Sequence, residues 1–192
     1  MAEPAIRRMT LEEFLQWEDG TDTRYELIDG FPVAMAPPAR ARGILCARLA
    51  GELTAALRSR PPCTAQVEAG IARPDRSDSC YIADLAVTCR PYQRGEQLVQ
   101  EPILIAEVLS PGTERHDRRA KVPAYREIES VQEILLIDSE AAYAEIFRRR
   151  GAFWFSEIIR GREAVLYLAS IDLRLPMAEL YEEIDLQADI AT

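Results

Sequence analysis

Two short apolar segments constrain the fold of this chain more than any other feature. The segments Tyr81–Val87 and Pro102–Leu109 each carry one acidic side chain inside an otherwise apolar run. Such runs are typical of strands that are covered on both faces, as in the middle of a sheet flanked by helices. We therefore expect these two strands to form the centre of the sheet, with Glu133–Asp138 as a further buried strand.

The segments before the central strands predict two helices and a hairpin. Thr10–Trp17 opens with a capping box and predicts a short helix. Arg24–Met35 has strand-type residues on both sides of an Asp-Gly pair, which indicates a hairpin and puts Glu26 on a strand, on the face opposite to Leu27. Ala39–Arg58 has apolar residues at helical spacing, followed by two prolines, and predicts a long helix.

The second half of the chain predicts a helix and then a group of strands. Glu114–Ile128 is polar around a few apolar positions, and we expect a helix with its proline in the first turn or at a kink. Three further segments, Ala142–Arg148, Phe153–Arg160 and Ala164–Leu168, predict an antiparallel meander, and Met177–Ile184 predicts a terminal helix. The expected fold is a single α/β (α+β) domain over residues 1–192, with a mixed sheet flanked by helices.

Composition limits the possible partners and surroundings. The net charge of -9 argues against broad, sequence-independent binding to nucleic acid, although bunched arginines could make one face positive. The four cysteines include no CxxC pair, so we expect reduced thiols and no zinc site. Neither a leader segment nor a membrane-length apolar run is visible, which favours a cytoplasmic protein that does not bind membranes.

An acid on each central strand and a single lysine form the candidate site. Of the 23 basic residues only Lys121 is a lysine, and it follows Asp84 and Glu107 in the chain. Carboxylates inside apolar strands are costly to bury unless they are paired or bind a metal, and hard oxygen donors suit Mg²⁺ or Mn²⁺. A metal could polarise a phosphate while a lysine orients the attacking water, as metal-assisted phosphodiester hydrolysis requires.

Each of these residues also has a purely structural interpretation. Asp84 and Glu107 could lie at strand ends and pair with arginines, and Lys121 could be a solvated helix residue or pair with Asp117. His116, the only histidine, fits a surface or supporting position better than that of a metal ligand, because adjacent helix residues point about 100° apart.

The motifs around these residues resemble a known family. The matching segments are Tyr25-Glu26-Leu27-Ile28-Asp29-Gly30, Ala83-Asp84-Leu85-Ala86-Val87, Glu107-Val108-Leu109-Ser110-Pro111-Gly112-Thr113, and the spaced Asp117, Lys121 and Tyr125. From about Met9 to Tyr181 the chain resembles the Uma-two restriction endonucleases, a branch of the PD-(D/E)XK nuclease superfamily. The resemblance implies a restriction-endonuclease-like fold.

The resemblance also implies roles for individual residues. Asp84 and Glu107 would be ligands of Mg²⁺ or Mn²⁺, the backbone carbonyl of Val108 would be a further ligand, and Glu26 would be an additional acid at the same site. The superfamily's lysine two residues after the glutamate is Leu109 here, and Lys121 stands where relatives supply it from the following helix. Where relatives tend to carry a histidine, the segment 40–43 has arginines.

Two functions from different classes remain open at this point. One is a metal-dependent endonuclease that hydrolyses phosphodiester bonds in DNA, with Asp84, Glu107, Lys121 and Glu26 in its site and a homodimer or higher homo-oligomer as its assembly. The apolar meander after residue 142 is the candidate surface for that assembly. The alternative is a nuclease fold that serves as a non-catalytic binding or assembly module, which the acidic charge and the missing lysine in the motif would suit.

Overall fold

The protein folds around one large mixed sheet. The computed structural model describes residues 7–37 and 39–186. The strands are β1 (Tyr25–Ile28), β2 (Phe31–Ala34), β3 (Thr64–Ala72), β4 (Cys80–Thr88), β5 (Pro102–Leu109), β6 (Glu133–Asp138), β7 (Tyr143–Arg150), β8 (Phe153–Arg160), β9 (Val165–Leu168) and β10 (Leu173–Pro176). The helices are α1 (Leu11–Leu15), α2 (Arg40–Leu57), α3 (Glu114–His116), the π-helical turn η1 (Asp117–Lys121), α4 (Val122–Arg126) and α5 (Met177–Leu180).

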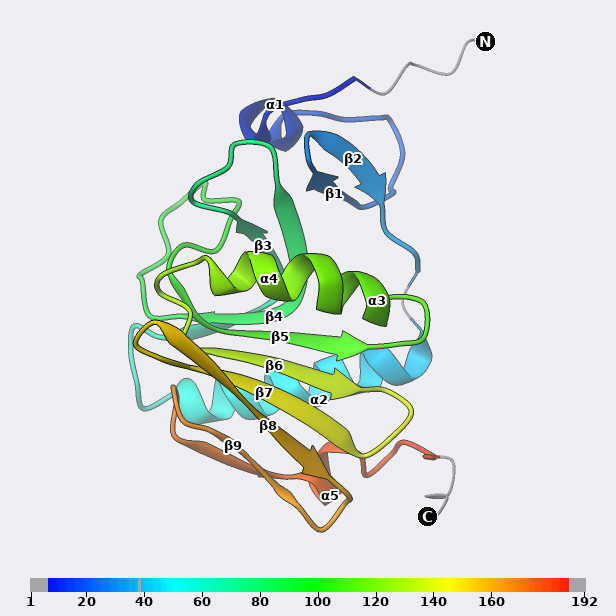
Figure 1. The fold of residues 1–192 in the computed structure, drawn as a ribbon, viewed down its shortest axis with the longest axis vertical. Helices are drawn as coiled ribbons and strands as arrows, with labels where there is room; N and C mark the ends of the chain where they lie inside the picture. Colours follow the sequence, from blue (N-terminus) through cyan, green and yellow to red (C-terminus); the bar gives the residue numbers. More distant parts are fainter. Residues whose placement is uncertain (1–6, 38, 187–192) are drawn as a thin grey trace.

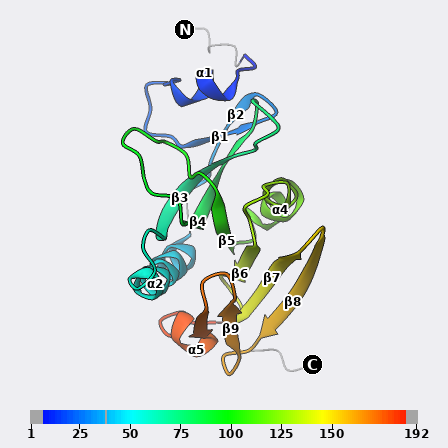
Figure 2. The ribbon, with the colours of Figure 1, turned by 90° about the vertical axis from the view of Figure 1, so that its left-hand side faces the viewer.

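The two acid-bearing strands lie in the middle of the sheet, as the sequence predicts. The large sheet has the order β2-β1-β4-β5-β6-β7-β8, with β3 also paired to β4, and β5 and β6 are parallel while the other neighbours are antiparallel. Figures 1 and 2 show α2 on one face of this sheet and α3–α4 on the other. The expected mixed sheet flanked by helices is therefore confirmed.

Helix α2 packs on the sheet through one stripe of its surface. Leu45, Leu49, Leu53 and Leu57 recur every four residues, so they lie on one side of the helix, and all four are buried against the strands. Burying one such side chain contributes about 2 kcal/mol of hydrophobic free energy. Arg42 extends the same stripe by one turn and is also buried, so a charged side chain lies at the end of an apolar face.

The predicted hairpin is present and carries Glu26. Strands β1 and β2 pair antiparallel, and the turn residues Asp29 and Gly30 have φ angles of 50° and 87°. Positive φ at both central positions matches the type I′ turn, whose twist suits a two-residue hairpin. Glu26 and Leu27 are both buried even though they are adjacent on β1, so the polar Glu26 needs a partner inside the protein.

One edge of β4 has a gap in its pairing. Strand β3 pairs with β4 from Thr64–Thr88 to Ala72–Cys80, with Glu68 as the one residue outside the ladder. The other edge is shared, because β1 pairs with β4 only at Cys80 while the β5 ladder reaches no further than Leu85. Residues 81–84 therefore have no strand partner on that edge. Their backbone groups must find other partners, since unpaired buried amides are costly.

The end of the chain departs from the predicted meander. Strands β7 and β8 form the expected hairpin, but β9 pairs with β10 in a separate two-stranded sheet and not with β8. Leu166, Leu168 and Leu175 are buried in the core under α2, so this ribbon covers the core and does not extend the large sheet. The expected terminal helix is also shorter, because α5 ends at Leu180.

The cysteines are not all reduced, contrary to the prediction. Cys63 and Cys89 form a disulfide next to the Thr64–Thr88 pair, where the two strand ends meet. Sequence spacing alone gave no sign of this, because the two residues are separated by 26 positions and become neighbours only when β3 and β4 pair. Cys46 and Cys80 are free thiols. Within the described ranges, no helix is both long and apolar enough to cross a membrane.

Candidate active site

Side chains take the place of a strand in the gap on β4. The Ile82 backbone N–H donates to Glu26 Oε1 at 3.0 Å, and the Ile82 carbonyl accepts from Lys121 Nζ at 2.8 Å. The N–H and C=O of one strand residue point to the same edge. Glu26 and Lys121 therefore make the hydrogen bonds that a neighbouring strand would make with Ile82. The same bonds hold the two side chains in place.

Lys121 is the centre of a buried group of carboxylates. Its Nζ lies 3.0 Å from Glu26 Oε1, 3.3 Å from Glu107 Oε1 and 3.4 Å from Asp117 Oδ1. Burial disfavours the ammonium, but Glu107, Glu26 and Asp117 outweigh this and raise the pKa of Lys121. The side chain is therefore a cation that neutralises acids, and the expected alternative of a solvated lysine is wrong. Pairing with Asp117 is present, as one part of a larger network.

A π-helical turn directs this lysine into the core. Residues 117–121 form η1, in which Val122 N–H bonds to the Asp117 carbonyl, directly before Pro123. Proline has no N–H to donate to the preceding turn, and a wider turn accommodates that loss. The predicted helix with a proline irregularity is thus found as the continuous segment α3–η1–α4. The turn brings Asp117 and Lys121 to the same buried side.

Glu107 is the most deeply buried acid of the site. Its side chain has no exposed surface, and Tyr125 Oη donates to its Oε1 at 2.7 Å. Burial raises the pKa of Glu107 to about 8, and the charges of Asp84 and Asp117 act in the same direction while Lys121 and Tyr125 oppose them. Burial is the largest of these effects, because a carboxyl group without access to water favours its neutral form.

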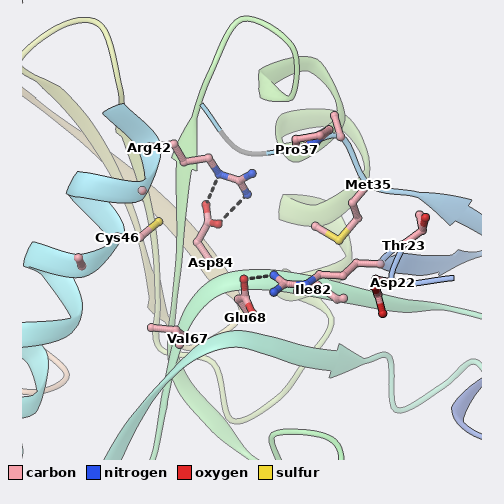
Figure 3. A pocket seen from close by; sticks show the side chains of 14 residues that line it. Asp22, Thr23, Met35, Pro37, Arg42, Cys46, Val67, Glu68, Ile82 and Asp84 are labelled. Atoms are coloured by element: carbon pink, nitrogen blue, oxygen red, sulfur yellow. Dashed lines mark hydrogen bonds and ion pairs between the residues drawn. The ribbon is translucent and has the colours of Figure 1, made fainter. Parts of the chain in front are cut away.

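Asp84 is held by an arginine from the opposite face of the sheet. Arg42 Nη2 lies 2.6 Å from Asp84 Oδ1, and Arg42 Nε lies 3.1 Å from Oδ2, which also accepts from the Val108 N–H at 2.7 Å. The two side chains face each other from α2 and β4 in the wall of a cavity of about 840 Å³ (Figure 3). The interpretation of Asp84 as an arginine-paired acid therefore describes this structure.

His116 supports Glu26 from the rim of the site. His116 Nε2 lies 3.0 Å from Glu26 Oε2, and the ring is partly exposed. Burial acts to raise the pKa of Glu26, but the hydrogen bond with His116 and the charge of Lys121 lower it overall. The position agrees with the expectation of a supporting residue.

The structure brings the predicted residues together and adds one that the sequence analysis did not single out. Asp84, Glu107, Lys121, Glu26 and the Val108 backbone all meet at the gap on β4. Arg42 is the addition, and Asp117, which the sequence analysis named as a possible partner of Lys121, belongs to the same cluster. In the part of the chain that the structure describes, no three acidic, histidine or cysteine side chains are spaced to ligate a metal ion as they stand. The carboxylates of Asp84 and Glu107 face Arg42 and Lys121 instead.

The burial of Arg42 could have been inferred from its position in the sequence of α2. Arg42 lies three residues before Leu45, on the stripe that also holds Leu49 and Leu53. A charged residue on the apolar face of an amphipathic helix implies a buried partner of opposite charge. Asp84 was the acid that needed a cation, so pattern and chemistry together could have suggested the pair.

The protein is thus a mixed α/β protein with a buried cluster of acids at the centre of its sheet. The structure superimposes on a crystal structure from Anabaena variabilis, described as a "putative nuclease belonging to DUF820", with a TM-score of 0.74 and 17% identity. The match covers 91% of this chain and 98% of that one. At this identity the likeness concerns the fold.

The sequence places the chain in a family. The profile of the Uma2 family, described as "Putative restriction endonuclease", matches residues 11–178, and the chain belongs to this family. An uncharacterized protein of Synechocystis sp., slr1290, is 28% identical over 152 residues, which is 74% of this chain and 75% of that protein. The resemblance inferred from the motifs is confirmed.

Proposed function

We propose that the protein is a metal-dependent endonuclease that hydrolyses phosphodiester bonds in DNA. Asp84, Glu107 and the Val108 carbonyl are the proposed ligands of Mg²⁺ or Mn²⁺, with Glu26 as an additional acid and Lys121 beside them. The observation that carries the proposal is the gap on β4, where these groups gather beside the cavity that Asp84 lines. Membership of the Uma2 family supports it.

The net charge of the residues in the site suits a divalent cation. Four carboxylates, Glu26, Asp84, Glu107 and Asp117, face two permanent cations, Arg42 and Lys121, which leaves two negative charges when all four acids are ionised. Oxygen donors of this kind suit Mg²⁺ and Mn²⁺. Asp117 Oδ2 is buried and has no hydrogen-bond partner among the described residues, which is consistent with a site that is completed by a further ligand.

The backbone of Val108 also fits a ligand position. Its N–H donates to Asp84, and the carbonyl of a strand residue points to the same edge as its N–H. The carbonyl therefore faces the gap that holds Asp84 and Glu107.

Each group has a defined part in the proposed chemistry. A bound divalent cation supplies a Lewis acid that polarises the phosphate and lowers the pKa of a water molecule. Lys121 is already protonated and cannot accept a proton, so it orients the water and offsets the negative charge that develops on the phosphate. Glu26 and Tyr125 hold Lys121 and Glu107 in place through the contacts described above.

Calorimetry and a cleavage assay test the proposal together. We expect saturable Mn²⁺ binding by the wild type, and its loss in Asp84→Asn and Glu107→Gln. Cleavage of supercoiled and linear DNA should be lost in both variants and in Lys121→Met. Glu129→Gln, which removes an exposed acid that is not part of the buried cluster, is the control and should keep both properties.

The same experiment addresses the alternative of a non-catalytic nuclease-fold module. The observation that favours this alternative is that Asp84 and Glu107 already have partners from the protein itself, Arg42 and Lys121. A wild type that neither binds Mn²⁺ saturably nor cleaves DNA would support the module and contradict the enzyme. Cleavage of RNA and not DNA would correct the substrate.

A homodimer or higher homo-oligomer in the cytoplasm is part of the proposal, because cutting a duplex requires two scissile sites. Strand β8 is at the edge of the large sheet and exposes Phe153 and Phe155 by 70% and 52%. Light scattering should give at least twice the mass of one chain for the wild type and one chain for Phe155→Glu. A monomeric wild type would contradict the assembly.

A further inference from the structure

The guanidinium of Arg42 is paired with the carboxylate of Asp84 in a position that excludes a second cation. The guanidinium contacts both carboxylate oxygens, and Oδ2 also accepts from Val108. Both side chains are about nine-tenths buried, at 8% and 11% exposure. A divalent ion at Asp84 would therefore lie within a few ångströms of a permanent positive charge in poorly hydrated surroundings, where like charges repel strongly.

The guanidinium cannot yield by losing its proton. Guanidinium groups keep their charge in proteins, so the side chain stays positive. A metal at Asp84 therefore requires the side chain of Arg42 to move. The side chain has room to do so, because Arg42 and Asp84 both line the cavity (Figure 3). Its third nitrogen, Nη1, makes no hydrogen bond to the described residues.

The cavity offers a place where a substrate phosphate could meet Arg42. Guanidinium binds carboxylate and phosphate with the same two-pronged geometry, so a phosphodiester can replace Asp84 as its partner. Inside the cavity wall, Arg42 is the basic residue nearest to the acids of the gap, while Arg24, the other basic residue of the wall, pairs with Glu68. The exchange would leave both charges paired.

We propose that Arg42 is an exchangeable counter-ion. It neutralises Asp84 in the metal-free protein, is displaced when a divalent cation binds there, and then binds the phosphodiester of the substrate. The inference rests on the proposed metal-dependent function and adds a substrate-binding residue to it. It also assigns a reason for the arginine at this position of α2.

Mn²⁺ affinity measures the first step. Arg42→Gln removes the competing charge and keeps a polar side chain, so calorimetry should show Mn²⁺ binding tighter by about tenfold or more, within the range of ordinary coupling between sites. Arg42→Lys keeps the charge without the two-pronged contact, so its Mn²⁺ affinity should lie between those of the wild type and Arg42→Gln. Arg40→Gln removes an exposed charge two residues earlier in α2, and it should bind Mn²⁺ with the affinity of the wild type.

Thermal unfolding gives a second reading that does not depend on activity. Without metal, Arg42→Gln should unfold at a lower temperature than the wild type, because Asp84 loses its partner. Added Mn²⁺ should raise its unfolding temperature by more than it raises that of the wild type. If Arg42→Gln does not fold without metal, Arg42→Lys carries the same comparison.

The outcomes separate this inference from the proposed function. Equal or weaker Mn²⁺ binding by Arg42→Gln would overturn the inference and leave the metal site intact. Absence of Mn²⁺ binding in the wild type and all three variants would overturn both. Tighter binding in Arg42→Gln alone, with an intermediate Arg42→Lys, supports the exchange.

DNA affinity measures the second step. Fluorescence anisotropy with a labelled duplex in Ca²⁺, another cation that prefers oxygen ligands, should show about tenfold weaker binding for Arg42→Gln than for Arg40→Gln, as expected for one lost charged hydrogen-bonded contact. In EDTA the guanidinium of Arg42 stays paired with Asp84 in Arg40→Gln and cannot bind a phosphate. The two variants should therefore bind the duplex with equal affinity. Equal affinities under both conditions would overturn the phosphate-binding role.

Discussion

Replacing Lys121 by methionine removes the charge at the centre of the site while keeping most of the side-chain volume. The ammonium contacts three carboxylates at 3.0–3.4 Å and donates to the Ile82 carbonyl at 2.8 Å. Breaking a buried ion pair by removing one partner costs about 3–5 kcal/mol. A buried carbonyl without a donor adds about 1–3 kcal/mol. Partial protonation of Glu107 offsets some of this, so we expect a loss of about 3–5 kcal/mol at pH 7.

The loss should depend on pH. Lys121 lowers the pKa of Glu26, which its own burial acts to raise. Because the pKa of Glu26 is lower in the folded protein than its ordinary value of 4.5, its ionised form stabilises the wild type at any pH above 4.5. This stabilisation is lost as the pH falls from 4.5 through the pKa of the folded state. In the variant the pKa of Glu26 rises, so acid stabilises its folded state relative to neutral pH. The difference between wild type and variant should therefore shrink from pH 7 to pH 5.

Urea unfolding followed by circular dichroism in EDTA measures both effects. The matched control is Arg119→Met, which removes an exposed cation from the same π-helical turn and should change the free energy of unfolding by less than about 0.5 kcal/mol. A loss below about 1 kcal/mol for Lys121→Met at pH 7, or an equal loss at both pH values, would refute the account of Lys121 as the counter-ion of the buried acids.

Three further predictions concern the thiols and the tyrosine. The double variant Cys63→Ala/Cys89→Ala should lose about 3 kcal/mol of stability, since the disulfide closes a loop of 26 positions, and dithiothreitol should lower the unfolding midpoint of the wild type but not of the variant. Burial raises the pKa of Cys46 to about 12 from 9.0, so it should react with a thiol reagent at pH 8 about a thousandfold more slowly than a free cysteine until the protein unfolds. Tyr125→Phe removes a hydrogen bond to Glu107 that lowers its pKa. Wild-type stability should decrease between pH 4.5 and about 8, because the unfolded chain releases the proton that Glu107 keeps, and in the variant this decrease should continue to higher pH.

The parts of the fold that follow from local pattern were predictable, and so were the acids. Apolar runs predicted β4 and β5 at the centre, and the Asp-Gly pair predicted the β1–β2 hairpin. Asp84 and Glu107 stood out because an ionised carboxylate inside an apolar strand requires a partner. Lys121 stood out because it is the only lysine in a chain rich in arginine.

The features that were missed depend on contacts between distant segments. Strand β9 has the alternating pattern of a meander strand, but nothing local distinguishes pairing with β8 from pairing with β10. The Cys63–Cys89 disulfide likewise exists only once β3 and β4 are in register. The π-helical turn reflects tertiary burial of Asp117 and Lys121 together with Pro123, and helical periodicity alone predicts an ordinary turn there.

The gap on β4 makes the proposed active-site residues part of the fold itself. Glu26 and Lys121 complete the backbone pairing of Ile82, and Asp84 completes that of Val108. Substitutions at these positions therefore act on stability and on chemistry together. An inactive variant is informative only if its folded fraction is measured in the same buffer. Amide variants such as Asp84→Asn keep one oxygen acceptor for the backbone N–H, while they lose the charge and the second acceptor oxygen. They separate the two roles better than alanine does, because alanine also removes the partner of a buried backbone group.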